Sequence, residues 1–550
     1  MKELIKTYLG DIIRKVAPDF KDEVLVEIPE NKEHGDYTSS VAFSLSKTLR
    51  RPPQAVAEEL VKKLNSQKIK DFSKIESVNG FVNFVLSEVC LYHQLKEILN
   101  QKNKYGFKDI PPSLKLRRTM QVEFISANPT GPPTIGNGRG GFYGDVLANI
   151  LETQGYKVTR EFYVNDRGGQ ILALGRSIKL VQGEKLNLSP FKRSLAGGEK
   201  TELDNLYKGN YINELAKQIG KNLSVEEAGQ EAVDLILNTY IKPVIKKFGI
   251  NFNVWFSEKS LYRNGIYKKV MENLMQKDLV YEKDGATWMK TSELGDTKDR
   301  VLIKSNGDET YFMSDILYHL NKFEVRKFDK VINIWGADHH GDIPRLIGAL
   351  KILGIDLERF KIMLIQFVRL VSSGSKTKVS KRAGTFITLE ELVDKVGLDA
   401  ARFFFLMYSN DTHMDFDIDL AKERSQKNPV YYVQYAHARV SSILRKAGIS
   451  KLQALSPKLI SLKTKAELNL IRKLIEFPEI LSNIAANYEV HRLPRYALEL
   501  AREFHNFYEK ERVISEDKKL TSARLALVLA AKIVLGNALN LMGIKASDKM

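Results

Sequence analysis

Two short stretches of this sequence carry residues suited to binding phosphate. The first is a glycine-rich run over residues 126–141, and the second is Lys378-Val379-Ser380-Lys381-Arg382, which follows the Ser/Gly-rich segment 372–375. Glycines let a backbone approach an anion closely, and N–H groups at the start of a following helix point toward it. A lysine on a closing loop can stabilise charge that moves onto leaving pyrophosphate. Alone, each stretch has a plain alternative, a tight turn for the first and a solvated basic loop for the second.

The segments around both stretches predict a parallel α/β sheet. A strand-like run lies directly before the glycine-rich stretch, and others alternate with helical patterns up to about residue 390. The polar stretch 186–210 looks like an insertion, and Ser224 with Glu227 forms a capping box before a long helix. The predicted strands are 119–124, 157–164, 330–335 and 361–368.

The two ends of the chain differ from this central part. The opening hundred or so residues predict a small mixed domain, with a helix at 55–64, a strand at 81–86 and a turn at Asn79-Gly80. Helical spacing dominates beyond about residue 428, which indicates an all-α bundle. Its predicted helices are 431–446, 468–486, 494–511 and 522–542. We expect domains at 1–112, 113–390 (with an insertion around 170–250) and 428–550, with a connecting segment at 391–427.

Composition narrows the class of protein. Lys and Arg total 85 against 67 for Asp and Glu, a net charge of +18, which favours a nucleic-acid partner, although a basic surface also serves solubility or an anionic membrane. The single cysteine, Cys90, cannot form an internal disulfide, and no Cys/His cluster predicts a structural zinc site. We expect a cytoplasmic protein without a signal peptide, whose apolar segment 525–542, interrupted by Lys532, packs inside it and does not span a membrane.

Together the two phosphate stretches resemble the paired signatures of class I aminoacyl-tRNA synthetases, His-x-Gly-His and Lys-Met-Ser-Lys-Ser. Other motifs of the chain are similar to those of bacterial arginyl-tRNA synthetases: residues 123–132, Tyr163-Val164-Asn165-Asp166, the run 335–341, Asp399-Ala400-Ala401-Arg402 and the run 428–439. Segments 32–37 and 542–550 resemble the two ends of that family. The resemblance therefore covers nearly the whole chain.

This resemblance implies a multidomain α/β fold: an N-terminal α+β domain that binds the elbow and D-loop side of tRNA, a Rossmann-like catalytic domain with an insertion, and a C-terminal all-α helical anticodon-binding bundle. It implies an arginine–tRNA ligase acting in protein synthesis. Arginine and ATP would give arginyl-adenylate and pyrophosphate, with Mg²⁺ offsetting phosphate charge and with bound tRNA required. The 2′-hydroxyl of the terminal adenosine of tRNA(Arg) would then accept the arginine. The family habit is a monomer without a membrane partner.

The resemblance also assigns site residues. An arginine guanidinium calls for carboxylates that accept forked hydrogen bonds. The positions that match the arginine site of the family are Asn128, Glu258, Tyr311, Asp315 and His339. Catalytic roles fall on Thr134, Asn137, Lys378, Ser380 and Lys381, and ATP contacts on Gly136, Gly138, Arg139, Lys378 and Lys381. No metal ligand is predicted.

The first signature departs from the family because Thr134 and Asn137 stand where histidines are usual. Each can donate a hydrogen bond to a phosphate oxygen, although the reach and charge of imidazole are lost. One alternative is therefore a catalytically weakened, synthetase-like RNA-binding paralogue. Another is a different nucleotidyltransferase, or a class I synthetase with another amino acid. Charging of tRNA by the purified protein separates a ligase from the paralogue, and amino-acid-dependent exchange measured across all twenty amino acids, with total tRNA present, would reveal the third possibility.

Overall fold

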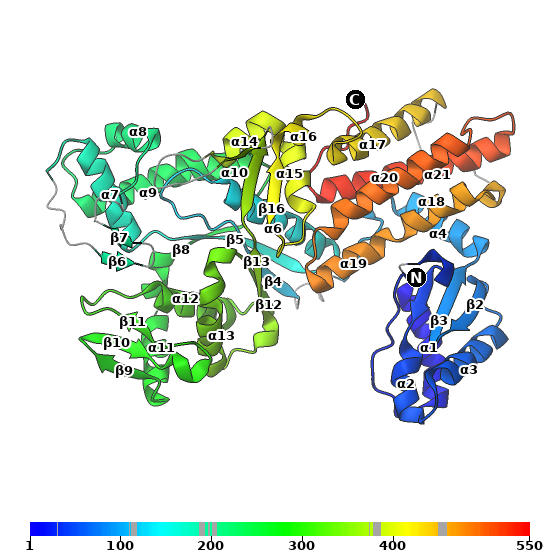
Figure 1. The fold of residues 1–550 in the computed structure, drawn as a ribbon, viewed down its shortest axis with the longest axis horizontal. Coiled ribbons are helices and arrows are strands. Elements are labelled where there is room, and N and C mark those ends of the chain that lie inside the picture. The colour runs from blue at the N-terminus through cyan, green and yellow to red at the C-terminus, as the bar shows by residue number, and fades with distance from the viewer. Residues whose placement is uncertain are drawn as a thin grey trace.

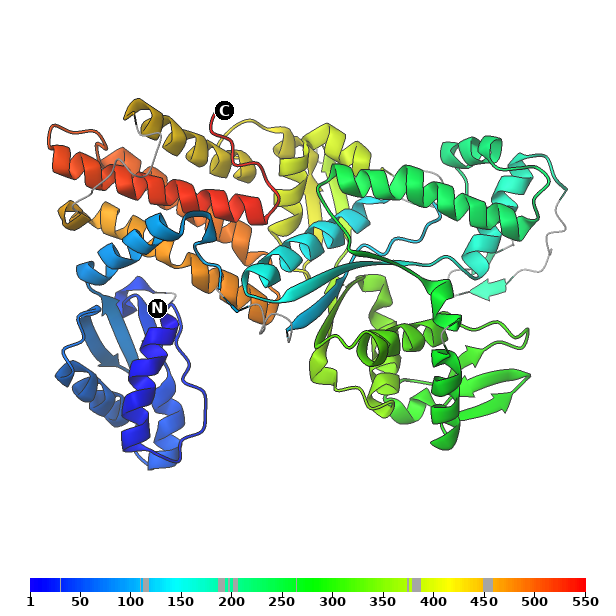
Figure 2. The same ribbon diagram turned by 180° about the vertical axis from the view of Figure 1, so that it is seen from behind.

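The structure is a computed structural model, and it forms one elongated molecule (Figure 1). Seen from behind, the N-terminal domain lies below the helical bundle, and two inserted lobes lie at the opposite end (Figure 2). The described residues are 1–29, 31–108, 110–111, 118–185, 206–263, 265–372, 387–448 and 459–550, together with the backbone of three short strands. These strands are β6 (Arg193–Leu195), β7 (Gly198–Lys200) and β15 (Ser375–Thr377).

The N-terminal domain packs three helices against an antiparallel sheet of order β1-β3-β2. Asn79 and Gly80 both have positive φ, 51° and 84°, and form the predicted turn between β2 and β3. Val82, Phe84 and Leu86 are buried in the sheet that this turn builds. The elements are α1 (Lys2–Val16), β1 (Tyr37–Ser39), α2 (Val41–Leu49), α3 (Pro53–Ser66), β2 (Phe72–Val78), β3 (Phe81–Leu86) and then α4 (Glu88–Gln101), which packs on the bundle.

The central sheet is parallel throughout, with strand order β13-β12-β4-β5-β8. Helix α6 (Ile135–Thr153) follows the first strand, as a phosphate-binding turn requires. The prediction of one strand at 361–368 is wrong in extent, because Asn410 bonds the chain at Leu364 O and Gln366 N–H and a second strand begins at Val368. The strands are β4 (Thr119–Glu123), β5 (Lys157–Val164), β8 (Val254–Ser257), β12 (Lys330–Gly336) and β13 (Phe360–Ile365).

Two lobes are inserted in the chain between strands of this sheet. A helical lobe lies between β5 and β8, and its helices α7 and α9 approach so closely that a Cβ on Gly175 would lie 1.9 Å from Val225 O. Ser224 and Glu227 form the predicted capping box there. The helices are α7 (Gly169–Val181), α8 (Asn210–Gln218), α9 (Val225–Ile236) and α10 (Lys242–Lys247).

The sequence analysis did not predict the second lobe, which lies between β8 and β12. It carries a separate antiparallel sheet and a hydrophobic core of its own. Its helix α12 nevertheless reaches the central sheet and supplies functional side chains. The elements are α11 (Ile266–Gln276), β9 (Val280–Lys283), β10 (Ala286–Met289), β11 (Arg300–Ile303) and α12 (Tyr311–Leu320), before α13 (Ile343–Ile352) beyond β12.

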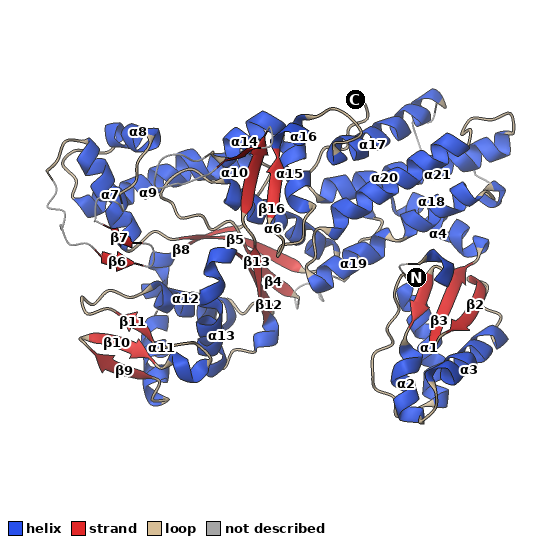
Figure 3. Ribbon diagram, viewed as in Figure 1, coloured by secondary structure: helices blue, strands red, loops and turns tan. Residues whose placement is uncertain are grey.

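A connecting unit follows β13 and leads into an all-helical bundle (Figure 3). The predicted helix 468–486 is two helices, since Pro478 lies in the first turn of the second. Helix α21 is long and apolar enough to cross a membrane, but here it packs within the bundle. The connecting elements are β14 (Val368–Ser372), α14 (Leu389–Val396), α15 (Leu398–Leu406), β16 (Met414–Asp417) and α16 (Ile418–Lys422). The bundle comprises α17 (Pro429–Lys446), α18 (Lys465–Ile475), α19 (Phe477–Asn487), α20 (Arg492–Lys510) and α21 (Lys518–Leu541).

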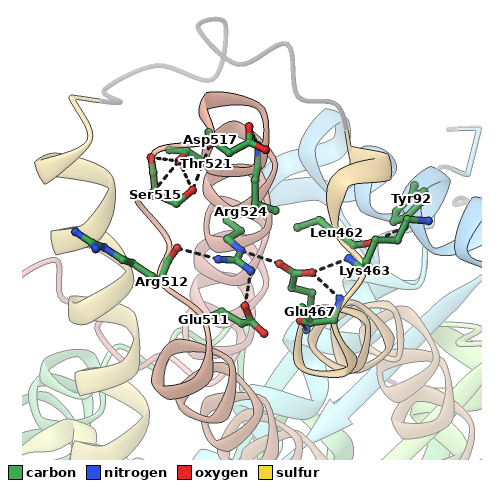
Figure 4. A network of polar contacts seen from close by, with 12 residues as sticks. Tyr92, Leu462, Lys463, Glu467, Glu511, Arg512, Ser515, Asp517, Thr521 and Arg524 are labelled. Carbon is green, nitrogen blue, oxygen red and sulfur yellow. Dashed lines mark hydrogen bonds and ion pairs between the residues drawn. The ribbon is translucent and has the colours of Figure 1, made fainter.

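Inside the bundle, Arg524 of α21 joins three segments (Figure 4). Its guanidinium donates to Glu467 Oε1 at 2.7 Å, to the Glu511 carboxylate and to Arg512 O at 2.9 Å. The other oxygen of Glu467 accepts the N–H groups of Lys463 and Thr464 at the start of α18. This buried pair therefore fixes α18 against α21.

Helix α6 and its neighbour α15 join the catalytic part to the bundle through main-chain carbonyls. The Tyr143 hydroxyl donates to Tyr488 O, and Asn149 Nδ2 donates to Leu541 O at 3.1 Å. Arg402 Nη1 donates to Asp145 Oδ2 at 2.8 Å and to Met542 O at 3.0 Å. These contacts hold the C-terminal ends of α19 and α21 against α6 and α15.

Candidate active site

A cavity of about 630 Å³ opens at the carboxyl ends of β4, β5 and β12. Parallel sheets bind ligands at this edge because loops from several strands converge there. The cavity brings together residues that the sequence placed in both the ATP and the arginine sites. They are Asn128, Thr134, Gly136, Asn137, Tyr311, Asp315 and His339.

The turn after β4 has an unusual backbone. Ile125 and Ser126 both have left-handed φ, 65° and 37°. Such non-glycine conformations cost roughly 1–3 kcal/mol each and gather at functional sites. Ser126 Oγ stabilises the turn by donating to Glu123 Oε1 at 3.1 Å and accepting from Tyr163 N–H at 3.0 Å. The turn directs the chain through Asn128 along the cavity wall.

A buried chain of polar contacts supports the floor of the cavity. Lys322 Nζ donates to Glu123 Oε2 at 2.7 Å and to Asn333 Oδ1 at 2.8 Å. Burial lowers the pKa of His319 well below its usual value, so the ring is neutral. Its Nε2 accepts from Asn333 Nδ2 at 2.6 Å, and its Nδ1–H donates to Asp315 O at 2.7 Å. The chain thus links β4 and β12 to the turn of α12 that carries Asp315.

The two residues that replace the family histidines bond to each other at the start of α6. Asn137 Oδ1 accepts both the N–H and the hydroxyl of Thr134, each at 2.9 Å. Thr134 also forms a β-bridge with Thr388, and Leu389 N–H donates to Pro133 O at 2.9 Å. These contacts tie the first signature to the end of the segment that carries the second.

Gly138 and Arg139 do not line the cavity. Gly138 packs under α14, where a Cβ would lie 2.4 Å from Leu389 Cδ1. Arg139 is only 1% exposed, and its guanidinium donates at 2.8 Å to the carbonyl oxygens of Gln366, Ser409 and Thr412. The guanidinium of Arg139 is thus directed at these carbonyl groups and Gly138 is covered by Leu389, so neither residue faces the cavity.

Glu258 lies behind the cavity wall at the end of β8 and is 2% exposed. Its Oε1 accepts from Ser314 Oγ at 2.6 Å, and Ser314 itself lines the cavity. Its Oε2 is buried without a hydrogen-bond partner. Burial raises the pKa of Glu258 to about 7, against the opposing effects of Ser314 and Arg167. An unpaired buried carboxylate oxygen is costly, so this geometry favours a cationic ligand.

Asp315 lies one residue beyond Ser314 and faces the same cavity. Burial raises its pKa to about 8, helped by the nearby Asp342, Glu123 and Glu258 carboxylates. Among the described residues, no hydrogen bond or ion pair reaches its side chain. Two carboxyl groups with raised pKa values therefore lie next to the cavity, as a guanidinium site requires.

The remaining arginine-site residues lie at the rim of the cavity. Tyr311 is 48% exposed at the start of α12. His339 Nδ1 lies 3.1 Å from Asp342 Oδ2, and this hydrogen bond is the main cause that raises its pKa, supported by Asp338. A histidine held this way can present positive charge to a carboxylate or phosphate.

The second signature, Lys378, Ser380 and Lys381, lies outside the described residues. Sequence reasoning also missed part of the cavity wall. Gln366 and Phe367 lie at the break between β13 and β14, which the prediction of one long strand concealed. The charged pair Asp342 and Arg345 was detectable, because three-residue spacing next to the 335–341 run places both on one helical face. The missed lining residues include Asn165, Gln170, Asp342, Arg345, Gln366 and Phe367.

Comparison with known proteins matches three family models in order along the chain. They are the arginyl tRNA synthetase N-terminal domain at residues 2–86, the class I (R) tRNA synthetase catalytic domain at 94–419 and the DALR anticodon binding domain at 433–550. The arginine–tRNA ligases of Aquifex aeolicus and Carboxydothermus hydrogenoformans are 41% and 42% identical, with all of each chain covered. The solved Thermus thermophilus arginyl-tRNA synthetase shares the fold, with a TM-score of 0.76 over both full lengths at 22% identity.

Proposed function

The chain belongs to the arginyl-tRNA synthetases and is an arginine–tRNA ligase that uses ATP. We propose which of its residues bind arginine, which bind ATP and which stabilise the transition state. The observation that carries the proposal is the pair of Glu258 and Asp315. A buried, unpartnered Glu258 Oε2 and an Asp315 carboxylate without a described partner lie next to one cavity. Together they accept the planar guanidinium of arginine in a fork.

This pair also accounts for specificity. A guanidinium can donate to both carboxylates at once, whereas the ammonium of lysine is a point charge without a planar fork. A site that leaves a buried carboxylate oxygen unpaired with the wrong substrate discriminates strongly against it. Tyr311 supports the side chain of arginine, and Asn128 and His339 bind its ammonium and carboxylate ends.

ATP binds at the start of α6. The N-terminus of this helix stabilises negative charge, and Gly136 lets phosphate approach its backbone. Because Asn137 Oδ1 accepts from Thr134, its Nδ2 faces outward as a donor, and it donates to no described residue. We assign to this amide the phosphate contact that a histidine makes in relatives. Lys378, Ser380 and Lys381 approach the phosphates from the second signature.

The reaction proceeds in two displacements. A carboxylate oxygen of arginine bonds to the α-phosphorus of ATP, and pyrophosphate leaves. The 2′-hydroxyl of the terminal adenosine of tRNA(Arg) then attacks the adenylate carbonyl, and AMP leaves. Mg²⁺ would be carried by the phosphates of ATP, whose oxygens are the ligands that this cation prefers. Lys381 stabilises charge during the first displacement.

We extend the proposal to the arrangement of the chain. Residues 1–112 bind the tRNA elbow, residues 113–390 catalyse, residues 391–427 connect, and residues 428–550 bind the anticodon. The enzyme acts as a monomer in the cytoplasm.

Arginine-dependent, tRNA-dependent ATP–pyrophosphate exchange tests these roles. Lys381→Ala should slow exchange at least 100-fold, the usual scale for a lost transition-state contact. Glu258→Gln should raise the KM for arginine with little change for ATP. The matched control is Lys395→Ala, an exposed lysine in the last turn of α14. Wild-type exchange in the Lys381 variant would remove that assignment, and exchange with another of the twenty amino acids would refute the arginine pocket.

A further inference from the structure

Asp166 is the last residue of the motif Tyr163-Val164-Asn165-Asp166, and the proposed mechanism assigns no role to this motif. It lies two residues beyond β5 and is 8% exposed. Its Oδ2 accepts the hydroxyl of Ser257, and its Oδ1 accepts the N–H of Lys259 at 3.1 Å. Ser257 and Lys259 are the two neighbours of Glu258, so one carboxylate bonds to the chain on both sides of that residue.

These bonds hold the point where β8 ends and a 3₁₀ turn, Glu258–Tyr262, begins. The first N–H groups of such a turn lack partners within it, and a side chain normally accepts them. Ser257 precedes the turn but does not cap it with its own side chain. Asp166, from the loop that follows the neighbouring strand β5, supplies the missing acceptor.

The next residue, Arg167, holds the far end of the same turn. Its guanidinium lies over the Tyr262 ring, 3.8 Å from the centroid, and pairs with Glu309 at 2.8 Å. The Tyr262 hydroxyl lies 2.8 Å from Ser314 Oγ, the group that donates to Glu258 Oε1. The turn is therefore fixed at its start, at its end and at the tip of the Glu258 side chain.

We propose that Asp166 is a positioning residue for arginine recognition, which orients Glu258 so that its unpartnered Oε2 meets the guanidinium. The inference rests on the proposed role of Glu258. Asp166 does not line the cavity. A fork of hydrogen bonds tolerates only a few tenths of an ångström of misplacement, so the support of the carboxylate decides its affinity.

The negative charge of Asp166 disfavours the ionised form of Glu258, so an electrostatic role and a positioning role predict opposite effects of removing it. Its negative charge is one of the causes that raise the pKa of Glu258, after burial. Asp166→Asn removes that charge, which favours ionised Glu258, but replaces one acceptor with an NH₂ group. One of the two bonds that flank Glu258 is then lost. An electrostatic role predicts tighter arginine binding by the variant, and a positioning role predicts weaker binding.

The experiment measures aminoacylation kinetics of the full-length enzyme with tRNA(Arg). Asp166→Asn should raise the KM for arginine about tenfold, the scale of one lost hydrogen bond, while kcat and the KM for ATP stay within about twofold. The inhibition constant of agmatine, a guanidinium compound without a carboxylate, should rise by the same factor. Ser257→Ala removes one donor and should raise the KM about threefold.

The matched control is Asp356→Asn. Asp356 accepts the N–H of Glu358 at 3.0 Å in a comparable 3₁₀ turn, Leu357–Arg359, which does not line the cavity. Its kinetics should match the wild type. A common rise in the KM for arginine and ATP, with loss of thermal stability, would show a merely structural role for Asp166.

Glu258→Gln, measured in parallel, separates the proposed arginine pocket from the positioning role of Asp166. If it leaves the KM for arginine unchanged, the proposed arginine pocket is wrong. If it raises that KM while Asp166→Asn leaves it unchanged or lowers it, only the positioning role is overturned. If Asp166→Asn does not fold, Ser257→Ala decides the question, because it leaves the carboxylate in place.

Discussion

Arginine binding should strengthen steeply as the pH rises from 6 to 8. Burial raises the pKa of Glu258 to about 7 and that of Asp315 to about 8. The guanidinium keeps its charge over this range, so its own contacts follow the ionisation of the two carboxylates, while His339, whose pKa is raised, acts on the other end of the ligand. In the free enzyme these groups bind protons that arginine must displace. Deprotonation costs the free folded enzyme stability, and the bound cation offsets this cost.

The size of the effect follows from the two pKa values. At pH 7 about half of Glu258 and about a tenth of Asp315 are ionised, so about 5% of molecules have both carboxylates charged. At pH 8 the fraction with both charged is about 45%. If the fork needs both charges, affinity should rise about tenfold over this interval, and binding at pH 7 should release about 1.4 protons.

Isothermal titration calorimetry with arginine, in two buffers of different ionisation enthalpy, measures both quantities without catalysis. Asp315→Asn is the informative variant, because it removes the group with the higher pKa. Its remaining pH dependence should flatten above pH 7.5. A dissociation constant that stays level between pH 6 and 8.5, with no proton release, would refute the two-carboxylate site.

Three further predictions concern other parts of the structure. Asn137→Ala should lower the free energy of unfolding by about 1 kcal/mol, measured by thermal unfolding, because the contacts to Thr134 are lost. It should also raise the KM for ATP in the exchange assay, and an unchanged KM would contradict the ATP role. Arg139→Met removes the donor of three carbonyl groups, of which only Ser409 O keeps another partner, the N–H of Thr412. The free energy of unfolding should therefore fall by about 2 kcal/mol, while a raised KM for ATP without lost stability would support the ATP contact that the sequence suggested. Arg524→Met isolates the buried Glu467 carboxylate and should cost about 3–5 kcal/mol in chemical denaturation, and a neutral result would show that the ion pair contributes no net stability.

Sequence patterns predicted the parallel sheet because buried strands and intervening helices have distinct periods. The same patterns failed where a local break depends on a distant contact. Nothing in residues 361–368 reveals that Asn410 ends one strand and that another begins at Val368. The lobe between β8 and β12 was also missed, since its short strands carry little periodic signal.

Site residues divide along a similar line. Glu258 and Asp315 were assigned by family position, and the burial and surroundings of their carboxyl groups became visible only with the fold. Arg139 illustrates the opposite case. Its place in the glycine-rich run suggested phosphate, but helical geometry turns it away from the cavity, toward three carbonyl groups from the strand break and the segment after α15. Sequence order alone does not reveal which side of a helix a residue occupies relative to a sheet not yet located.

The junction between α6 and the bundle affects how far the sequence of the bundle can diverge in evolution from that of the catalytic part. The bundle meets α6 and α15 through the carbonyl oxygens of Tyr488, Leu541 and Met542, which every amino acid possesses. Side chains on the bundle can therefore drift to suit a changing RNA without altering these three bonds. Two bundle residues are exceptions. Gln434 Nε2 donates to Asp399 Oδ2 of α15 at 2.8 Å, and a Cβ on Gly543, which has a φ of 66°, would lie 2.5 Å from Arg402 Nη1. Chimeras that exchange bundles between relatives should tolerate wide sequence divergence provided that Gln434 and Gly543 are kept.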